Sequence, residues 1–183
     1  MGIVNLTPDS FSSGGHSPDT GQVMSHMEKL LSDGADILDL GAESTRPGAQ
    51  PVPADQELAR LLPVLKLALG LGVPVSVDTY KPEVMRAALD MGADAINDVW
   101  ALRQGATPEC PSAADVVAQH PGCGVCLMHM HRDPTTMQIA PMVGSVLPPV
   151  IQFLEQRIQY IKALGVNSTH ILVDPGIGFG KTP

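Results

Sequence analysis

The sequence lacks the features that mark membrane, secreted and nucleic-acid-binding proteins. It has no run of about 18 uncharged apolar residues, which a membrane-spanning helix requires. Its first residues lack the basic and apolar regions of a secretion signal. Basic side chains are scarce, since 11 Lys and Arg stand against 19 Asp and Glu, and the formal net charge is −8. We therefore expect neither nucleic acid nor an anionic membrane as a partner.

Cysteine is also scarce, because the chain has only three. An odd, small number excludes a disulfide framework and indicates a reducing, cytoplasmic setting. Cys123 and Cys126 form a CxxC pair, which is compatible with redox or zinc chemistry. The pair overlaps the apolar run 124–128, however, and no second CxxC completes a zinc site. A redox pair would prefer a helix N-terminus, so a buried role in a strand is favoured.

What the sequence does contain is a regular alternation of short apolar segments and helical patterns. Hydrophobic residues make up 44% and charged residues 16%, a balance typical of a globular domain of 183 residues. Apolar residues spaced by three and four predict helices between the strands, with Pro63 an irregularity in one helix and Pro82 at the start of another. The expected strands are residues 2–5, 37–40, 73–78, 95–97, 124–130 and 171–174.

Nearly every expected strand ends on a polar residue. These residues are Asn5, Asp39, Asp78, Asn97, His129 and Asp174. In a TIM (β/α)8 barrel all strand ends meet at one mouth, where active sites are built, so a barrel explains the pattern with one assumption. The sequence thus predicts an α/β fold, an incomplete barrel with about six of eight βα units. We expect one domain over residues 1–183, without strands 7 and 8.

Several of these polar groups are candidates for ligand binding. Arg46, in the segment 43–48, offers a planar fork suited to phosphate, although a solvated loop arginine fits equally well. Asp78, Asn97 and Asp174 would suit a heterocycle with N–H donors and ring acceptors, such as the edge of a pterin. One strand-end Asp alone would often be only a helix cap. The three together favour a binding site.

Two further motifs give weaker signals. Residues 174–182 resemble a phosphate loop, but Pro175 stands where the Walker pattern needs glycine, so an NTPase is not supported. The glycines there more plausibly let the backbone approach a ligand. His129 and His131 lie on one strand face and could ligate a metal. No third ligand is near in sequence, so structural or hydrogen-bonding roles are favoured.

The motifs together resemble those of dihydropteroate synthases, in the same order and over almost the whole chain. They are residues 5–12 (Asn-Leu-Thr-Pro-Asp-Ser-Phe-Ser), 43–48 (Glu-Ser-Thr-Arg-Pro-Gly), 76–79, 96–98, 127–130 and 174–181. The resemblance implies a transferase of folate biosynthesis that is a sulfonamide target. Such an enzyme condenses 6-hydroxymethyl-7,8-dihydropterin pyrophosphate with p-aminobenzoate, which gives 7,8-dihydropteroate and pyrophosphate.

The resemblance also implies roles for single residues. Asn5 is similar to the Mg²⁺ contact beside the pyrophosphate, and Arg46 is similar to the arginine that binds the pyrophosphate. Asp78, Asn97 and Asp174 are similar to the pterin-edge ligands, and Arg46, Asp78 and Asp174 are the expected catalytic residues. The remaining expected substrate contacts are Thr45, Pro47, Met128, Phe179 and Lys181.

The sequence departs from the family pattern in two ways. The Ser-Arg-Lys motif of a seventh strand and the Arg-x-His motif of an eighth do not occur. Tyr80 and Trp100 are bulkier than expected after their strands, which affects the shape of the pocket. Two alternatives stay open: another pterin-binding barrel, such as a methyltetrahydrofolate–corrinoid methyltransferase domain, or an inactive truncated fragment. The resemblance implies a homodimer for a full-length chain.

Overall fold

The structure, a computed structural model, describes residues 1–7, 19–44 and 49–182. Its strands form one parallel sheet in which spatial order follows chain order, from β1 to β6. The strands are β1 (Gly2–Asn5), β2 (Leu38–Gly41), β3 (Val75–Asp78), β4 (Ala95–Asp98), β5 (Gly124–Met128) and β6 (Ile171–Asp174). All six expected strands are present.

Helices separate the strands, and local sequence signals set several of their ends. They are α2 (Thr20–Ser32), α3 (Ala54–Leu69), α4 (Pro82–Met91), α5 (Ala113–Ala118), α6 (Leu147–Ala163) and the 3-10 turn η1 (Ser168–His170). The Asp19 carboxylate caps α2 by accepting from the backbone N–H groups of Gly21 and Gln22. Pro82 opens α4, and Gly92 ends it with φ of 112°. The helix α3 runs through Pro63 without ending.

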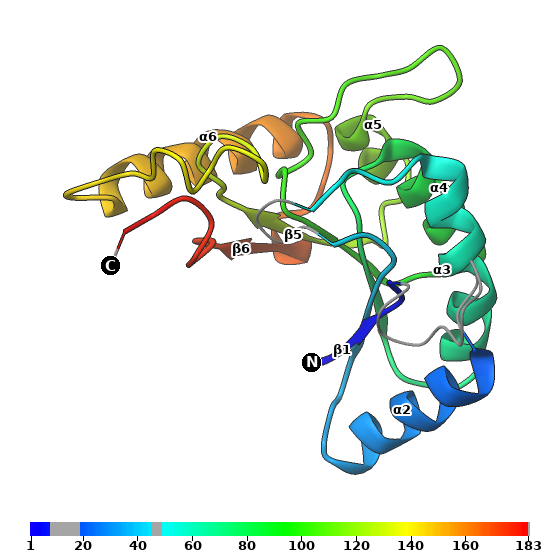
Figure 1. Ribbon diagram of the computed structural model, residues 1–183. Helices are drawn as coiled ribbons and strands as arrows, with labels where there is room; N and C mark the ends of the chain where they lie inside the picture. Colours follow the sequence, from blue (N-terminus) through cyan, green and yellow to red (C-terminus); the bar gives the residue numbers. More distant parts are fainter. Residues whose placement is uncertain (8–18, 45–48, 183) are drawn as a thin grey trace.

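The topology is that of a barrel wall. Figure 1 shows the helices following one another along one side of the sheet. Consecutive right-handed crossovers keep every helix on the same side, whereas a doubly wound sheet reverses its order and carries helices on both. The predicted (β/α) class is therefore confirmed. In the described ranges, no helix is both long and apolar enough to cross a bilayer.

The core lies between the sheet and the helices. On β2 and β3 the core side chains are fully buried, namely Leu38, Leu40, Val75 and Val77, all 0% exposed. They alternate with residues on the opposite face of the sheet, which lines the barrel interior. The three cysteines are free, and burial raises the pKa values of the Cys123 and Cys126 thiols to about 11. These thiols stay protonated at neutral pH, which argues against redox chemistry. Cys123 is part of the core, whereas Cys126 is half-buried and lies opposite Asn97 on the face of β5 that lines the barrel interior.

Candidate functional site

The polar strand ends form a row at the carboxyl edge of the sheet. Pairing across the strands places Asn5 opposite Gly41, Gly41 opposite Asp78, and Asp78 opposite Asn97. Asp174 pairs with Met128 at the end of β5. The structure therefore brings the predicted Asn5, Asp78, Asn97 and Asp174 to one mouth, although they are far apart in sequence. This is where barrel enzymes bind their ligands.

Asp78 is the most perturbed carboxyl group of this row. Burial raises its pKa to about 8, and the charges of Asp39 and Asp98 add to the shift. Its Oδ1 atom is buried and has no hydrogen-bond partner among the described residues. At neutral pH the group is therefore largely protonated, so it can donate a proton as well as accept a hydrogen bond.

The raised pKa of Asp78 predicts a pH-dependent cost to stability. The folded state keeps a proton that the unfolded chain releases near pH 4, so the free energy of unfolding falls as pH rises toward 8. The asparagine of Asp78→Asn cannot ionise. The free energy of unfolding of this variant, measured relative to that of the parent protein, should therefore rise by about 2–4 kcal/mol between pH 5 and pH 8. Urea unfolding at four pH values checks this, with exposed Asp36→Asn as control. A difference independent of pH contradicts it.

Asp98 has a structural role that the sequence did not reveal. Its carboxylate accepts from the backbone N–H groups of Trp100 and Leu102, both at 2.7 Å. Arg157 of α6 donates to the carbonyls of Ala101 and Leu102, at 2.8 and 2.9 Å. Ala101 and Leu102 have positive φ angles, which cost energy for residues with a side chain. Asp98 and Arg157 thus hold a strained turn directly after Asn97.

The glycine-rich loop after β6 is tied to the end of β5. The Asp174 carboxylate accepts from the Gly176 N–H at 2.7 Å. The Lys181 ammonium donates to the carbonyls of His129, Gly176 and Phe179 at 3.0, 2.8 and 3.2 Å. An ammonium group has three donors, and all are used here. In this structure Lys181 fastens the loop, and its predicted contact with substrate stays a prediction.

A small apolar cluster lies beside the row, separate from the main core. It comprises Val99, Met128, Met130 and Met137, with Tyr80, Trp100 and Phe179 packed against it. The cluster contains Met128 and Phe179, the two apolar contacts predicted from sequence. Met128 ends β5 and Phe179 lies in the loop after β6, so the two can form one wall of a pocket over the polar row.

His129 has the properties of a neutral, packed side chain. It is 7% exposed, and its ring meets Phe153 edge to face at 5.1 Å. Burial lowers its pKa to about 4, and the nearby Lys181 charge adds to this. The residues that the structure describes contain no group of three or more His, Cys, Asp or Glu side chains that could hold a metal ion. The packing against Phe153 supports a structural role for His129, while its buried Nδ1 atom has no hydrogen-bond partner among the described residues.

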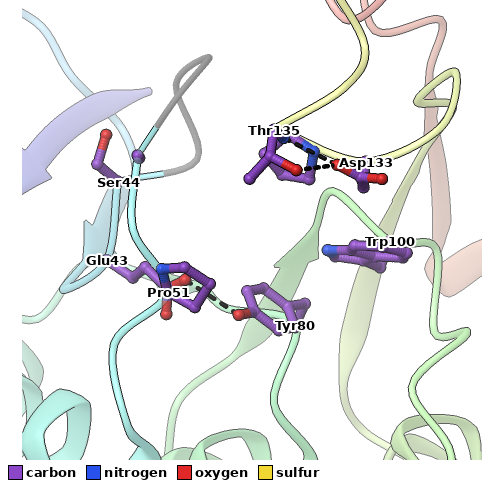
Figure 2. A pocket seen from close by; sticks show the side chains of 9 residues that line it. Glu43, Ser44, Pro51, Tyr80, Trp100, Asp133 and Thr135 are labelled. Carbon is purple, nitrogen blue, oxygen red and sulfur yellow. Dashed lines mark hydrogen bonds between the residues drawn. The ribbon is translucent and has the colours of Figure 1, made fainter.

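A cavity of about 190 Å³ opens next to the mouth. Figure 2 shows that its lining comes from the loops after β2, β3, β4 and β5. The lining residues are Glu43, Ser44, Ala49, Pro51, Tyr80, Trp100, Asp133, Pro134 and Thr135. Tyr80 and Trp100 thus shape this cavity, as their bulk suggested. The predicted Thr45, Arg46 and Pro47 lie outside the described residues, and Ser44 and Ala49 are their described neighbours.

A buried ion cluster lies beneath this cavity. Lys81 bridges the carboxylates of Glu43 and Glu57, and the Tyr80 hydroxyl donates to Glu43 at 3.0 Å. The side chains of Lys81, Glu43 and Glu57 are 12%, 7% and 1% exposed. Burial alone would lower the pKa of Lys81, but the two glutamates outweigh it and raise the pKa. The cluster fixes the start of the loop that leads to Thr45 and Arg46.

The comparison with known proteins agrees with this geometry. A family model described as "Pterin binding enzyme" matches residues 1–183. The chain is 46% identical over 184 residues to dihydropteroate synthase of Neisseria meningitidis serogroup C, a match that covers 100% of the chain and 63% of that protein.

Two solved structures extend the comparison. Burkholderia cenocepacia dihydropteroate synthase, in complex with 7,8-dihydropteroate, is 45% identical with a TM-score of 0.83. Yersinia pestis dihydropteroate synthase, in a complex with a sulfonamide drug, is 39% identical with a TM-score of 0.88. Each match covers 100% of this chain, but only 59% and 64% of the respective proteins. The chain thus spans about three fifths of these relatives' length.

Proposed function

This chain belongs to the family of pterin-binding enzymes, and on that premise we propose that the complete protein is a dihydropteroate synthase. The reaction is condensation of 6-hydroxymethyl-7,8-dihydropterin pyrophosphate with p-aminobenzoate, as part of folate biosynthesis. The observation that carries the proposal is the row of Asp78, Asn97 and Asp174 at one mouth. The bound 7,8-dihydropteroate of the Burkholderia cenocepacia relative supports it.

The pterin edge matches the groups that the row presents. An amino-pyrimidinone ring carries several N–H donors, and the row offers two carboxyl groups and one amide as acceptors. Met128 and Phe179 supply the apolar wall against which a flat ring packs. We assign Asp78, Asn97 and Asp174 to the pterin edge, and Met128 and Phe179 to the ring face.

The pyrophosphate needs positive partners in a chain whose net charge is −8. Arg46 is the proposed partner, and Thr45 and Pro47 are assigned to the p-aminobenzoate side. Asn5 offers an amide oxygen, the kind of ligand that Mg²⁺ accepts while keeping water and substrate phosphate oxygens. A bound Mg²⁺ would neutralise charge on the leaving pyrophosphate. The amide oxygen of Asn5, at the end of β1, thus fits this cofactor.

The chemistry requires positioning rather than a protein nucleophile. The C–O bond to pyrophosphate breaks, and the electron pair leaves with the pyrophosphate. Asp78 and Asp174 hold the pterin ring, whose nitrogen atoms delocalise the positive charge left on the methylene carbon. The p-aminobenzoate nitrogen then forms the C–N bond and releases one proton. Exclusion of water matters, because water would otherwise capture the cation.

Product formation tests the proposal. The complete protein as encoded should form 7,8-dihydropteroate from the two substrates, and the rate should depend on Mg²⁺. Methyl transfer from methyltetrahydrofolate without this product would instead favour the methyltransferase-like alternative. Pterin binding without either reaction would favour an inactive fragment.

The assignment of Arg46 gives a separate prediction. Arg46→Ala removes a phosphate contact, so affinity for pterin pyrophosphate should fall about 10- to 100-fold. Affinity for the same pterin without phosphate should change less than about twofold, since that ligand has no group for the arginine. Titration calorimetry with the two ligands measures both, and Lys66→Ala, which removes an exposed positive charge from α3, serves as the control. Equal losses for both ligands would remove Arg46 from the pyrophosphate site.

Location and assembly are also part of the proposal. Three free cysteines, two with thiol pKa values near 11, suit a reducing compartment such as the cytoplasm. The homodimer implied by the resemblance stays a prediction, which gel filtration of the complete protein would check.

A further inference from the structure

Asp39 is a buried carboxylate that the reaction scheme does not use. It lies on β2, where Leu38 and Leu40 point into the core, so Asp39 faces the inside of the barrel wall. Its side chain is 4% exposed. Its register partner on β3 is Ser76, a small residue that is 2% exposed. A small side chain at this point leaves space for Asp39 to reach past β3.

The side chain that Asp39 reaches is Asn97, two strands away on β4. The Asn97 Nδ2 group donates to Asp39 Oδ2 at 3.1 Å. A carboxylate only accepts, so it binds the nitrogen of the amide and turns the amide oxygen away. Asn97 is partly exposed at the mouth, and it therefore presents an acceptor there.

Two carboxyl oxygens on the inner face of the sheet have no partner, which indicates a site for a ligand with hydrogen-bond donors. Asp39 Oδ1 and Asp78 Oδ1 are both buried, and neither has a hydrogen-bond partner within the described part of the chain. Buried polar atoms are normally satisfied, so such atoms at a mouth indicate missing donors. Ring and amino N–H groups of a ligand would supply them.

We propose that Asp39 is a positioning residue. It fixes the Asn97 amide, so that the site selects a ring with an N–H donor opposite the amide oxygen. The inference rests on the proposed pterin site and adds a determinant of its specificity. An amide that is free to turn over would present N–H as readily as oxygen. The site would then lose its preference for a donor, even if the fold were unchanged.

The test uses Asp39→Asn, which has almost the same shape but can donate to Asn97 and let its amide turn over. The ligands are 6-hydroxymethylpterin and two analogues, one without the 2-amino group and one methylated at N3. The complete protein should lose about 10- to 100-fold in affinity for the parent ring. The affinity of the same variant for the analogue without the selected donor should change far less. The variant therefore loses the preference for the parent ring over that analogue. Asp36→Asn, the same change at an exposed position, should bind like the parent protein.

The exchange Asp39→Asn with Asn97→Asp gives a second, independent measurement. It restores one donor facing one carboxylate and keeps an acceptor at position 97, so much of the preference for the donor should return. Equal losses for all three ligands in Asp39→Asn would indicate a structural role and overturn the proposal, as would an unchanged preference. If the parent protein binds no pterin at all, the proposed function itself fails.

Discussion

Replacing Lys81 with methionine will lower the free energy of unfolding by about 3–5 kcal/mol, because two buried carboxylates lose their shared cation. Glu57 is 1% exposed, and burial already raises its pKa, so it cannot recover hydration without opening α3. For a chain of this length the melting temperature should fall by about 10 °C. Thermal and urea unfolding measure both quantities.

Two variants make this prediction specific. Lys66→Met removes an exposed lysine from α3 and should change stability by less than about 0.5 kcal/mol. Adding Glu43→Gln and Glu57→Gln to Lys81→Met removes the unpaired charges, so much of the lost stability should return. If the single change costs no more than the Lys66 control, the cluster is not a buried ion network.

Gly176→Ala should displace the loop after β6 from its contact with the end of β5. A Cβ atom there would overlap the His129 carbonyl oxygen and crowd Met128. Gly176 also has φ of +64°, which residues with a side chain adopt at a cost of about 1–2 kcal/mol. Strain and overlap together should cost about 3 kcal/mol or more. Pterin affinity should fall at least about tenfold, since Asp174 and Phe179 move with the loop.

Gly178 offers a matched control in the same loop. It has φ of +87°, but no atom lies within 4 Å of the position of an added Cβ. Gly178→Ala should therefore cost only about 1 kcal/mol and leave pterin affinity nearly unchanged. Equal effects of the two changes would mean that backbone conformation alone, and not the contact with His129, limits position 176.

The order of the elements could be predicted because hydrophobic periodicity is a local signal. The boundaries differed where one backbone group decided them. Val73 and Pro74 were expected in a strand, but β3 begins at Val75, and proline has no N–H to pair. The strand β5 ends at Met128, two residues earlier than expected, where the His129 carbonyl instead accepts from Lys181.

The polar row could be predicted because strand ends of a barrel must meet. Its supporting contacts could not, since they depend on distances between residues far apart in sequence. Nothing in the sequence shows that Lys81 reaches Glu57, or that Asp39 reaches Asn97 across β3. The three carbonyl partners of Lys181 could not be predicted for the same reason, since one of them, His129, lies directly after β5.

The strictly consecutive strand order has a consequence for how the protein is made. Each new strand pairs with the strand synthesised just before it, and no strand waits for a distant, later partner among β1 to β6. Such a chain can add one βα unit after another as it leaves the ribosome. We expect that ribosome-bound nascent chains become resistant to protease stepwise, one unit at a time, rather than all at once.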